Sequence, residues 1–124
     1  MAKKLPKSFN CPTEFTLAVL DGKWKTVILC YLKERPRRYT ELRKLVPKLS
    51  DKVLTERLHD LIASGLVARN RRTGPAQEYM LTQKGRLLSG VLHHLYAWGL
   101  ENAASFDVHV GQPLKVIEET RKAG

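Results

Sequence analysis

The chain has 124 residues, with 22 Lys and Arg against 12 Asp and Glu and a formal net charge of +10. This length accommodates one domain with a modest core. No apolar run approaches the roughly 18–20 residues of a membrane helix. No apolar signal core follows the basic start, so we expect a cytoplasmic protein without a membrane partner.

The positive charge is concentrated in the middle of the chain. Between Lys23 and Arg86 there are 16 basic and 6 acidic residues, whereas the remainder of the chain has 6 of each. Such a concentration indicates a basic working surface, for which nucleic acid is the expected partner.

A flexible basic arm over residues 1–10 precedes the first predicted helix. That helix spans residues 12–20, because proline suits a first helical turn and an Asp-Gly pair follows its last apolar residue. A second helix is expected to begin near Lys23 and to end before Pro36, since the residue before a proline disfavours the helical region. Its apolar stripe has steps of four residues and contains Trp24, Ile28 and Leu32.

The middle of the chain is predicted to form a helix-turn-helix. Thr40 is expected to cap a short helix over residues 41–46, and Ser50 to cap a helix over residues 51–64 that Gly65 ends. A short helix, a tight turn and a second helix are the parts of this motif, whose second helix enters the major groove of DNA.

Two short strands are expected to follow the motif, at residues 66–72 and 77–82, around a turn at residues 73–75. A further short extended segment is expected at residues 37–39. The hairpin is then the wing of a winged helix-turn-helix, so the predicted fold class is mainly α with a small β-hairpin.

Thr82 is expected to cap a long last helix over residues 83–102. Its apolar residues occupy more than one face, and one small domain cannot easily bury them all, so we expect a partner helix. The alternative is packing by the tail, residues 105–124, in which residues 114–122 form a candidate helix.

Residues 11–104 then form a single DNA-binding and dimerisation domain. The predicted dimer-interface residues are all apolar: Phe15, Leu88, Val91, Leu92, Leu95 and Trp98.

The candidate DNA-binding residues are cations and short polar side chains in and around the second helix of the motif and the hairpin. Long cationic side chains suit phosphates, whereas base reading needs donors and acceptors at groove depth. The hairpin tip suits the minor groove, where arginine is favoured when the groove is narrow. The candidates are Arg37, Arg38, Thr40, Ser50, Lys52, Thr55, Arg57, Arg69, Arg71 and Arg72. Arg57 lies at the side of its helix, so pairing with Glu56 or with a phosphate is an alternative.

The sequence contains no pattern that indicates catalysis, a metal or a cofactor, and we expect none of the three. The four histidines stand at no recognised zinc spacing with cysteine or carboxylate. There is no Gly-rich phosphate loop and no nucleophile with a placeable base.

The two cysteines have different expected roles. Cys11 lies at a helix N-terminus near Lys7, a setting that favours the thiolate, so Cys11 is a candidate redox sensor. The alternative is a small apolar residue at a dimer interface. Cys30 lies in the apolar second helix and is expected to be inert packing.

Short motifs in a specific order resemble the HxlR-type winged helix regulators, which are related in fold to MarR-type proteins. The resemblance runs from Cys11 to about Gly99. The matching pieces are Cys11-Pro12, Gly22-Lys23-Trp24, Ile28-Leu29, Arg38-Tyr39-Thr40-Glu41-Leu42, Ser50 with Lys52, Leu54-Thr55 with Leu58, Gly65-Leu66-Val67, Glu78-Tyr79 with Leu81-Thr82, Gly85, and Trp98-Gly99. The resemblance implies a homodimer built from the first and last helices, whose two recognition helices read a pseudo-palindromic operator. Some members of the family sense oxidants or electrophiles through the cysteine that Cys11 matches.

These observations together predict a sequence-specific transcriptional regulator that binds double-stranded DNA as a homodimer. The residues do not identify an inducer. One alternative is an architectural protein that binds DNA non-specifically, with an affinity that falls steeply with salt. Another is a protein-interaction module that has lost DNA binding, against which the basic middle of the chain argues.

Overall fold

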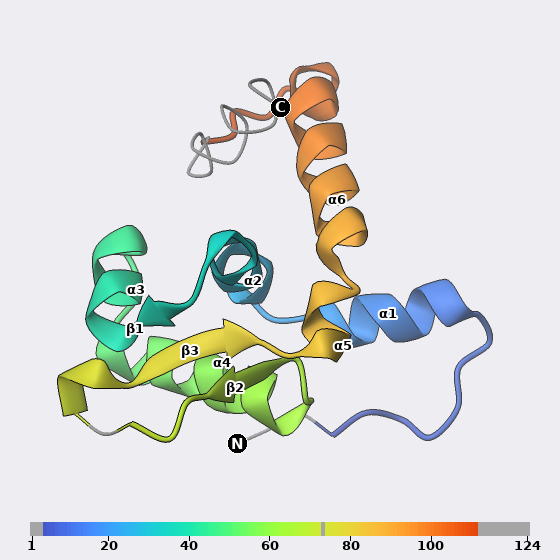
Figure 1. Cartoon of the computed structure of the whole chain (residues 1–124). Helices are drawn as coiled ribbons and strands as arrows, with labels where there is room; N and C mark the ends of the chain where they lie inside the picture. The colour runs from blue at the N-terminus through green and yellow to red at the C-terminus, as the bar shows by residue number, and fades with distance from the viewer. Residues whose placement is uncertain (1–3, 73, 112–124) are drawn as a thin grey trace.

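The structure, a computed structural model, describes residues 4–72 and 74–111 (Figure 1). The elements follow in the order α1 (Pro12–Leu20), α2 (Lys25–Glu34), β1 (Arg37–Arg38), α3 (Tyr39–Leu45), α4 (Asp51–Ala63), β2 (Val67–Arg69), the 3-10 turn η1 (Gly74–Ala76), β3 (Glu78–Leu81), α5 (Gln83–Arg86), α6 (Ser89–Asn102) and the 3-10 turn η2 (Ala103–Phe106). The predicted fold class, mainly helical with a small β-sheet, is confirmed. The candidate helix at residues 114–122 lies outside the described residues.

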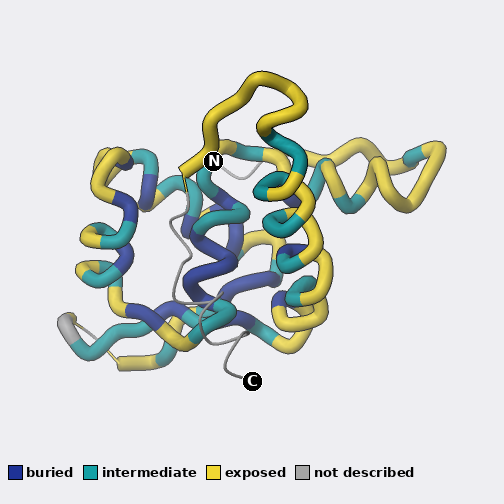
Figure 2. Tube along the Cα trace, turned by 90° about the horizontal axis from the view of Figure 1, so that it is seen from above, coloured by how far each residue is buried: buried dark blue, intermediate teal, exposed yellow. Residues whose placement is uncertain are grey.

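One hydrophobic core joins the helices to the sheet. Its side chains come from all the longer helices and from the sheet, including Leu20 of α1, and the buried positions gather in the interior of the trace (Figure 2). The stripe predicted for α2 contributes Ile28 and Leu32 to this core, and α4 contributes three leucines, Leu54, Leu58 and Leu61. No helix of the described residues is long and apolar enough to span a bilayer.

The sheet has three antiparallel strands in the order β1-β3-β2. The hairpin of β2 and β3 is the predicted one, with Val67 opposite Leu81. The extended segment expected at residues 37–39 becomes an edge strand of two residues, with Arg37 opposite Tyr79. This pairing joins segments about forty residues apart, so it depends on the tertiary fold.

The predicted caps of α4 and α5 are present. The Ser50 hydroxyl accepts a hydrogen bond from the Val53 amide at 3.1 Å. The Thr82 hydroxyl accepts one from the Gly85 amide at 3.0 Å. Because each cap satisfies an amide within three residues, sequence spacing is enough to predict it.

The prediction of one long helix over residues 83–102 is wrong. The chain forms two helices there, α5 and α6, with a break at Leu87 and Leu88. At the break the Leu88 amide bonds to the Gly85 carbonyl, three residues back, which tightens the turn and redirects the chain. A Cβ at Gly85 would lie 2.2 Å from the Leu66 carbonyl oxygen, so α5 lies directly against the start of β2. α6 then extends away from the sheet (Figure 1).

Two predicted helix starts also need correction. Thr40 is not an N-cap, because α3 begins at Tyr39 and the Arg38 amide donates to the Glu41 carboxylate at 3.1 Å. Trp24 precedes α2 with a φ of +78°, in the left-handed region, so the helix begins at Lys25.

Candidate nucleic-acid interface

Side-chain hydrogen bonds hold together the two helices of the predicted helix-turn-helix, α3 and α4. The Tyr39 hydroxyl and Arg43 Nε both donate to the Asp51 carboxylate, at 2.6 and 2.9 Å. These two bonds hold the pKa of Asp51 below its usual value, and the bond from Tyr39 has the larger effect. In the turn itself, the Leu49 amide donates to the Val46 carbonyl at 3.0 Å.

One face of α4 is available to a partner, because the opposite face lies in the core. Three polar side chains are exposed at steps of three and four residues, which places them on one side of the helix: Lys52, Thr55 and His59. Ser50 is exposed at the N-terminus of the same helix, whose dipole favours an anion such as a phosphate. Our list of candidates included Ser50, Lys52 and Thr55 but omitted His59, which the helical spacing alone could have added.

Arg57 lies at the flank of α4 and is half-buried. Its Nε donates to the Lys23 carbonyl at 2.9 Å, so it ties α4 to the turn that precedes α2. The predicted alternative, a pair with Glu56, is not among the ion pairs of the described residues. This contact is between residues 34 positions apart and has no signal in the local sequence.

Arg37 is buried, which corrects its assignment as a DNA-binding residue. Its guanidinium pairs with the Glu34 carboxylate, and its Nε donates to the Tyr31 carbonyl at 3.3 Å. A cation held in this way inside the protomer is not available to a phosphate. The neighbouring candidates Arg38 and Thr40 are both exposed.

The wing carries three exposed arginines, Arg69, Arg71 and Arg72. The strands of the wing, β2 and β3, extend toward the side of the molecule on which α3 lies (Figure 1). Asn70 shapes the wing, because its Oδ1 accepts from the amides of Arg72 and Glu78, at 3.3 and 3.1 Å. We did not single out Asn70 from the sequence, although an asparagine that enters a turn is a known signal for such bonds.

The face expected at the dimer interface is formed by α1 and α6. Four of its six predicted residues are exposed in the protomer: Phe15, Val91, Leu95 and Trp98. Leu88 is partly buried and packs on the core. Leu92 is only 1% exposed, which corrects its assignment to the interface, because a side chain inside the protomer's core cannot contact a partner.

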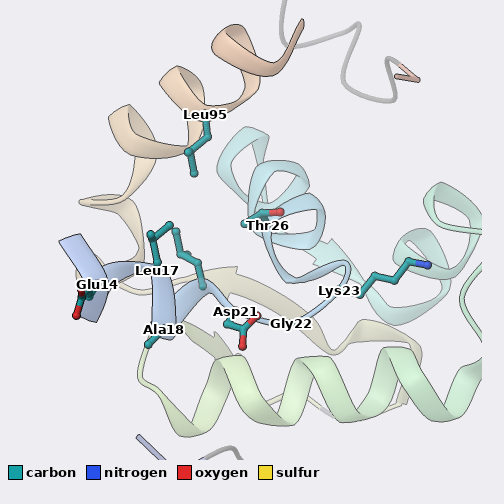
Figure 3. A pocket seen from close by; sticks show the side chains of 9 residues that line it. Glu14, Leu17, Ala18, Asp21, Gly22, Lys23, Thr26 and Leu95 are labelled. Atoms are coloured by element: carbon teal, nitrogen blue, oxygen red, sulfur yellow. The ribbon is translucent and has the colours of Figure 1, made fainter. Parts of the chain in front are cut away.

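An open pocket of about 700 Å³ lies between α1 and α6. Leu95 points from α6 toward α1, where Leu17 borders the pocket, and Thr26 of α2 lies to one side of them (Figure 3). Leu17 and Leu95 are 56% and 46% exposed, so apolar surface is open to solvent on both helices. Such a patch is typical of an interaction site.

The two thiols differ in exposure and in pKa. Cys11 is exposed, and the donors at the start of α1 lower its pKa, the Thr13 amide most, then the Thr13 hydroxyl and the Glu14 amide. The start of the helix therefore lowers the pKa of Cys11, as expected from the sequence. Lys7, which was also expected to favour the thiolate, does not contribute to this shift. Burial raises the pKa of Cys30 to about 11.

Among the residues that the structure describes, no three His, Cys, Asp or Glu side chains are grouped so that they could hold a metal ion. The exposed polar side chains of α4 and the wing include several cations and hydrogen-bond donors. Their chemistry suits a phosphate backbone with base edges beside it.

Comparison with known proteins gives consistent matches over most of the chain. Residues 19–106 match the family model described as HxlR-like helix-turn-helix. The HTH-type transcriptional regulator YtcD of Bacillus subtilis is 40% identical over 116 residues, which cover 92% of this chain and 90% of YtcD. The HTH-type regulator YdeP of the same species is 40% identical over 92 residues, 73% of this chain and 72% of YdeP.

Solved structures with the same fold include the regulators HypR and YodB. The redox regulator HypR in its reduced form superposes with a TM-score of 0.73 at 32% identity, covering 78% of this chain and 98% of HypR. The reduced form of the transcriptional regulator YodB from B. subtilis gives a TM-score of 0.64 at 31% identity, covering 73% of this chain and 92% of YodB.

Proposed function

Because the chain belongs to the HxlR-like helix-turn-helix family, whose relatives are DNA-binding transcriptional regulators, we propose that it reads a pseudo-palindromic operator as a homodimer. The exposed face of α4 carries this proposal. A helix with a capped N-terminus, a buried rear face and Lys52 and Thr55 in front has the features of a major-groove recognition helix. Arg69, Arg71 and Arg72 of the wing contact phosphates or the adjacent minor groove.

The dimer in this proposal forms across α1 and α6. Its support is the exposed apolar surface of Phe15, Leu95 and Trp98, together with the pocket between the two helices, into which a second copy inserts its own apolar side chains. Leu95→Glu places a charge on this surface and is expected to give a monomer in sedimentation analysis. A protein that remains dimeric with Leu95→Glu would contradict the assignment of this face.

Selection of bound sequences from random duplexes, followed by footprinting, tests the operator. Two half-sites about 10 bp apart, or a multiple of that, are expected from a dimer. A single half-site, or binding that ordinary competitor DNA removes at moderate salt, favours the architectural alternative. Lys52→Ala and Thr55→Ala are expected to relax the preferred sequence, whereas Lys84→Ala, an exposed cation of α5, serves as the control.

A second proposal concerns regulation: DNA binding responds to oxidants or electrophiles through Cys11. It is supported by the exposure and lowered pKa of this thiol and by the similarity to HypR, which is described as a redox regulator. Cys11→Ser is expected to abolish the effect of diamide or a quinone on DNA affinity, and Cys30→Ala to leave it intact. An unchanged response in Cys11→Ser removes the idea.

A further inference from the structure

A second, smaller pocket lies beside α4 and has a different character from the one between α1 and α6. Its volume is about 250 Å³, and it is bordered by α4, by α1 and by Leu5 of the N-terminal arm. Three polar side chains line it, Lys25, Asp60 and Ser64, and the remainder of its wall is short and apolar, with Ala18 and Val19 from α1.

Two of the polar residues are charged and almost fully buried. Lys25 is 5% exposed and Asp60 is 8% exposed. Asp60 Oδ1 has no hydrogen-bond partner within the described part of the chain. The ion pairs found among residues 4–72 and 74–111 do not join Lys25 to Asp60.

A buried carboxylate oxygen without a donor costs free energy. A group that donates to Asp60 removes this cost, and a carboxylate on the same ligand can accept from Lys25, a buried cation that lines the same pocket. A ligand with only a negative charge satisfies Lys25 and leaves Asp60 unpaired, and a cation does the reverse. The charge pattern of the pocket therefore favours a ligand that carries both charges.

We propose that this pocket binds a small aliphatic α-amino acid, with its ammonium group on Asp60 and its carboxylate on Lys25. The volume is below the roughly 300–1,000 Å³ of pockets for drug-sized ligands, so the ligand is small. The short apolar wall formed by Leu5, Ala18 and Val19 suits an aliphatic side chain.

The position of the pocket gives such a ligand a regulatory effect, which rests on the proposed function. Asp60 belongs to α4, the proposed recognition helix, and Ala18 and Val19 belong to α1, part of the proposed dimer face. A ligand held between the two helices favours one arrangement of α4 relative to α1. Coupling of this kind changes DNA affinity by roughly 5- to 150-fold in typical allosteric proteins.

The site is tested first on the full chain without DNA. Glycine, L-alanine, L-valine and L-leucine are titrated by calorimetry and by amide NMR shifts of Ala63 and Ser64. For the tightest of them, the matched compounds that lack either charge, the deaminated acid and the α-carboxamide, are each expected to bind at least about tenfold more weakly. Asp60→Asn and Lys25→Met are expected to abolish binding, whereas Glu56→Gln, a carboxylate variant elsewhere on α4, retains it.

Ala18→Leu provides a variant that does not alter the buried charges. Its larger side chain fills the pocket from α1 and is expected to block binding. This variant therefore still tests the site if Asp60→Asn fails to fold. The proposal is overturned if none of the four amino acids shifts the amides of Ala63 and Ser64 at concentrations up to about 50 mM. It is also overturned if folded Ala18→Leu or Asp60→Asn binds as well as the wild type.

DNA affinity measured with and without saturating amino acid then tests the regulatory effect. An affinity change of fivefold or more in the wild type, absent in Ala18→Leu, is expected. An unchanged affinity overturns the regulatory effect. If the protein binds no duplex with specificity, the proposed function fails. The titrations without DNA still determine whether the pocket binds an amino acid.

Discussion

The Tyr39 hydroxyl donates a hydrogen bond of 2.6 Å to the carboxylate of Asp51, and so joins the first residue of α3 to the first residue of α4. The two residues lie on either side of the turn in the helix-turn-helix. Arg43 adds a second bond to the same carboxylate. A side chain that is charged at neutral pH therefore links the two helices, in addition to the core that they share.

Stability should depend on pH through this contact. The folded-state pKa of Asp51 lies below the value of about 3.9 for an unfolded aspartate, so its contribution is present above that pH and is lost as the pH falls through the folded pKa. Asp51→Asn is expected to unfold at lower urea than the wild type at pH 7, with the difference shrinking below about pH 4. Asp107→Asn, at an exposed carboxylate beyond α6, is the control and should match the wild type. Equal urea midpoints for wild type and Asp51→Asn at pH 7 would contradict the prediction.

Arg37 should contribute to stability without contacting DNA. Arg37→Met leaves the Glu34 carboxylate in a mostly buried site without its partner, at an expected cost of about 3 kcal/mol in the free energy of unfolding. Glu34→Gln combined with Arg37→Met should recover part of this loss. DNA titrations over a range of salt should show the same slope for folded Arg37→Met as for the wild type. A smaller slope would mean that Arg37 reaches a phosphate after all.

The wing arginines should determine the salt dependence of DNA binding. Replacement of Arg71 and Arg72 by alanine is expected to reduce the slope of log affinity against log salt by about 2 for each protomer, because each lost phosphate contact removes roughly one released counterion. The preferred sequence should change little. Lys84→Ala tests whether loss of any surface cation has the same effect, and an equal change there would argue against a specific role for the wing.

The two thiols should react at very different rates. Cys30 is buried and its pKa is raised to about 11, whereas Cys11 is exposed and its pKa is lowered. Alkylation of the folded protein by iodoacetamide at pH 7, followed by mass spectrometry, should modify Cys11 roughly 100-fold faster or more. The rate at Cys11 should level off at a lower pH than that of a free cysteine thiol. Comparable rates at the two positions in the folded chain would contradict both assignments.

The sequence alone was enough to predict those features that depend on neighbouring residues. The caps at Ser50 and Thr82, the order of the helices around the turn, and the hairpin all arise from bonds or periodicities within a few positions of one another. The concentration of positive charge is also a property of the sequence. The exposed positions of Lys52 and Thr55 on α4 agree with helical geometry, because the apolar stripe of this helix faces the core.

The tertiary structure decided the burial of individual side chains. Arg37 and Leu92 were expected at the surface, but the core encloses both. The break before α6, the bond from Arg57 to the Lys23 carbonyl and the pairing of β1 with β3 likewise join residues brought together only by folding. The pocket that contains Lys25 and Asp60 has the same origin. Burial and long-range contacts depend on how several elements pack together, so no local pattern around one residue can specify them.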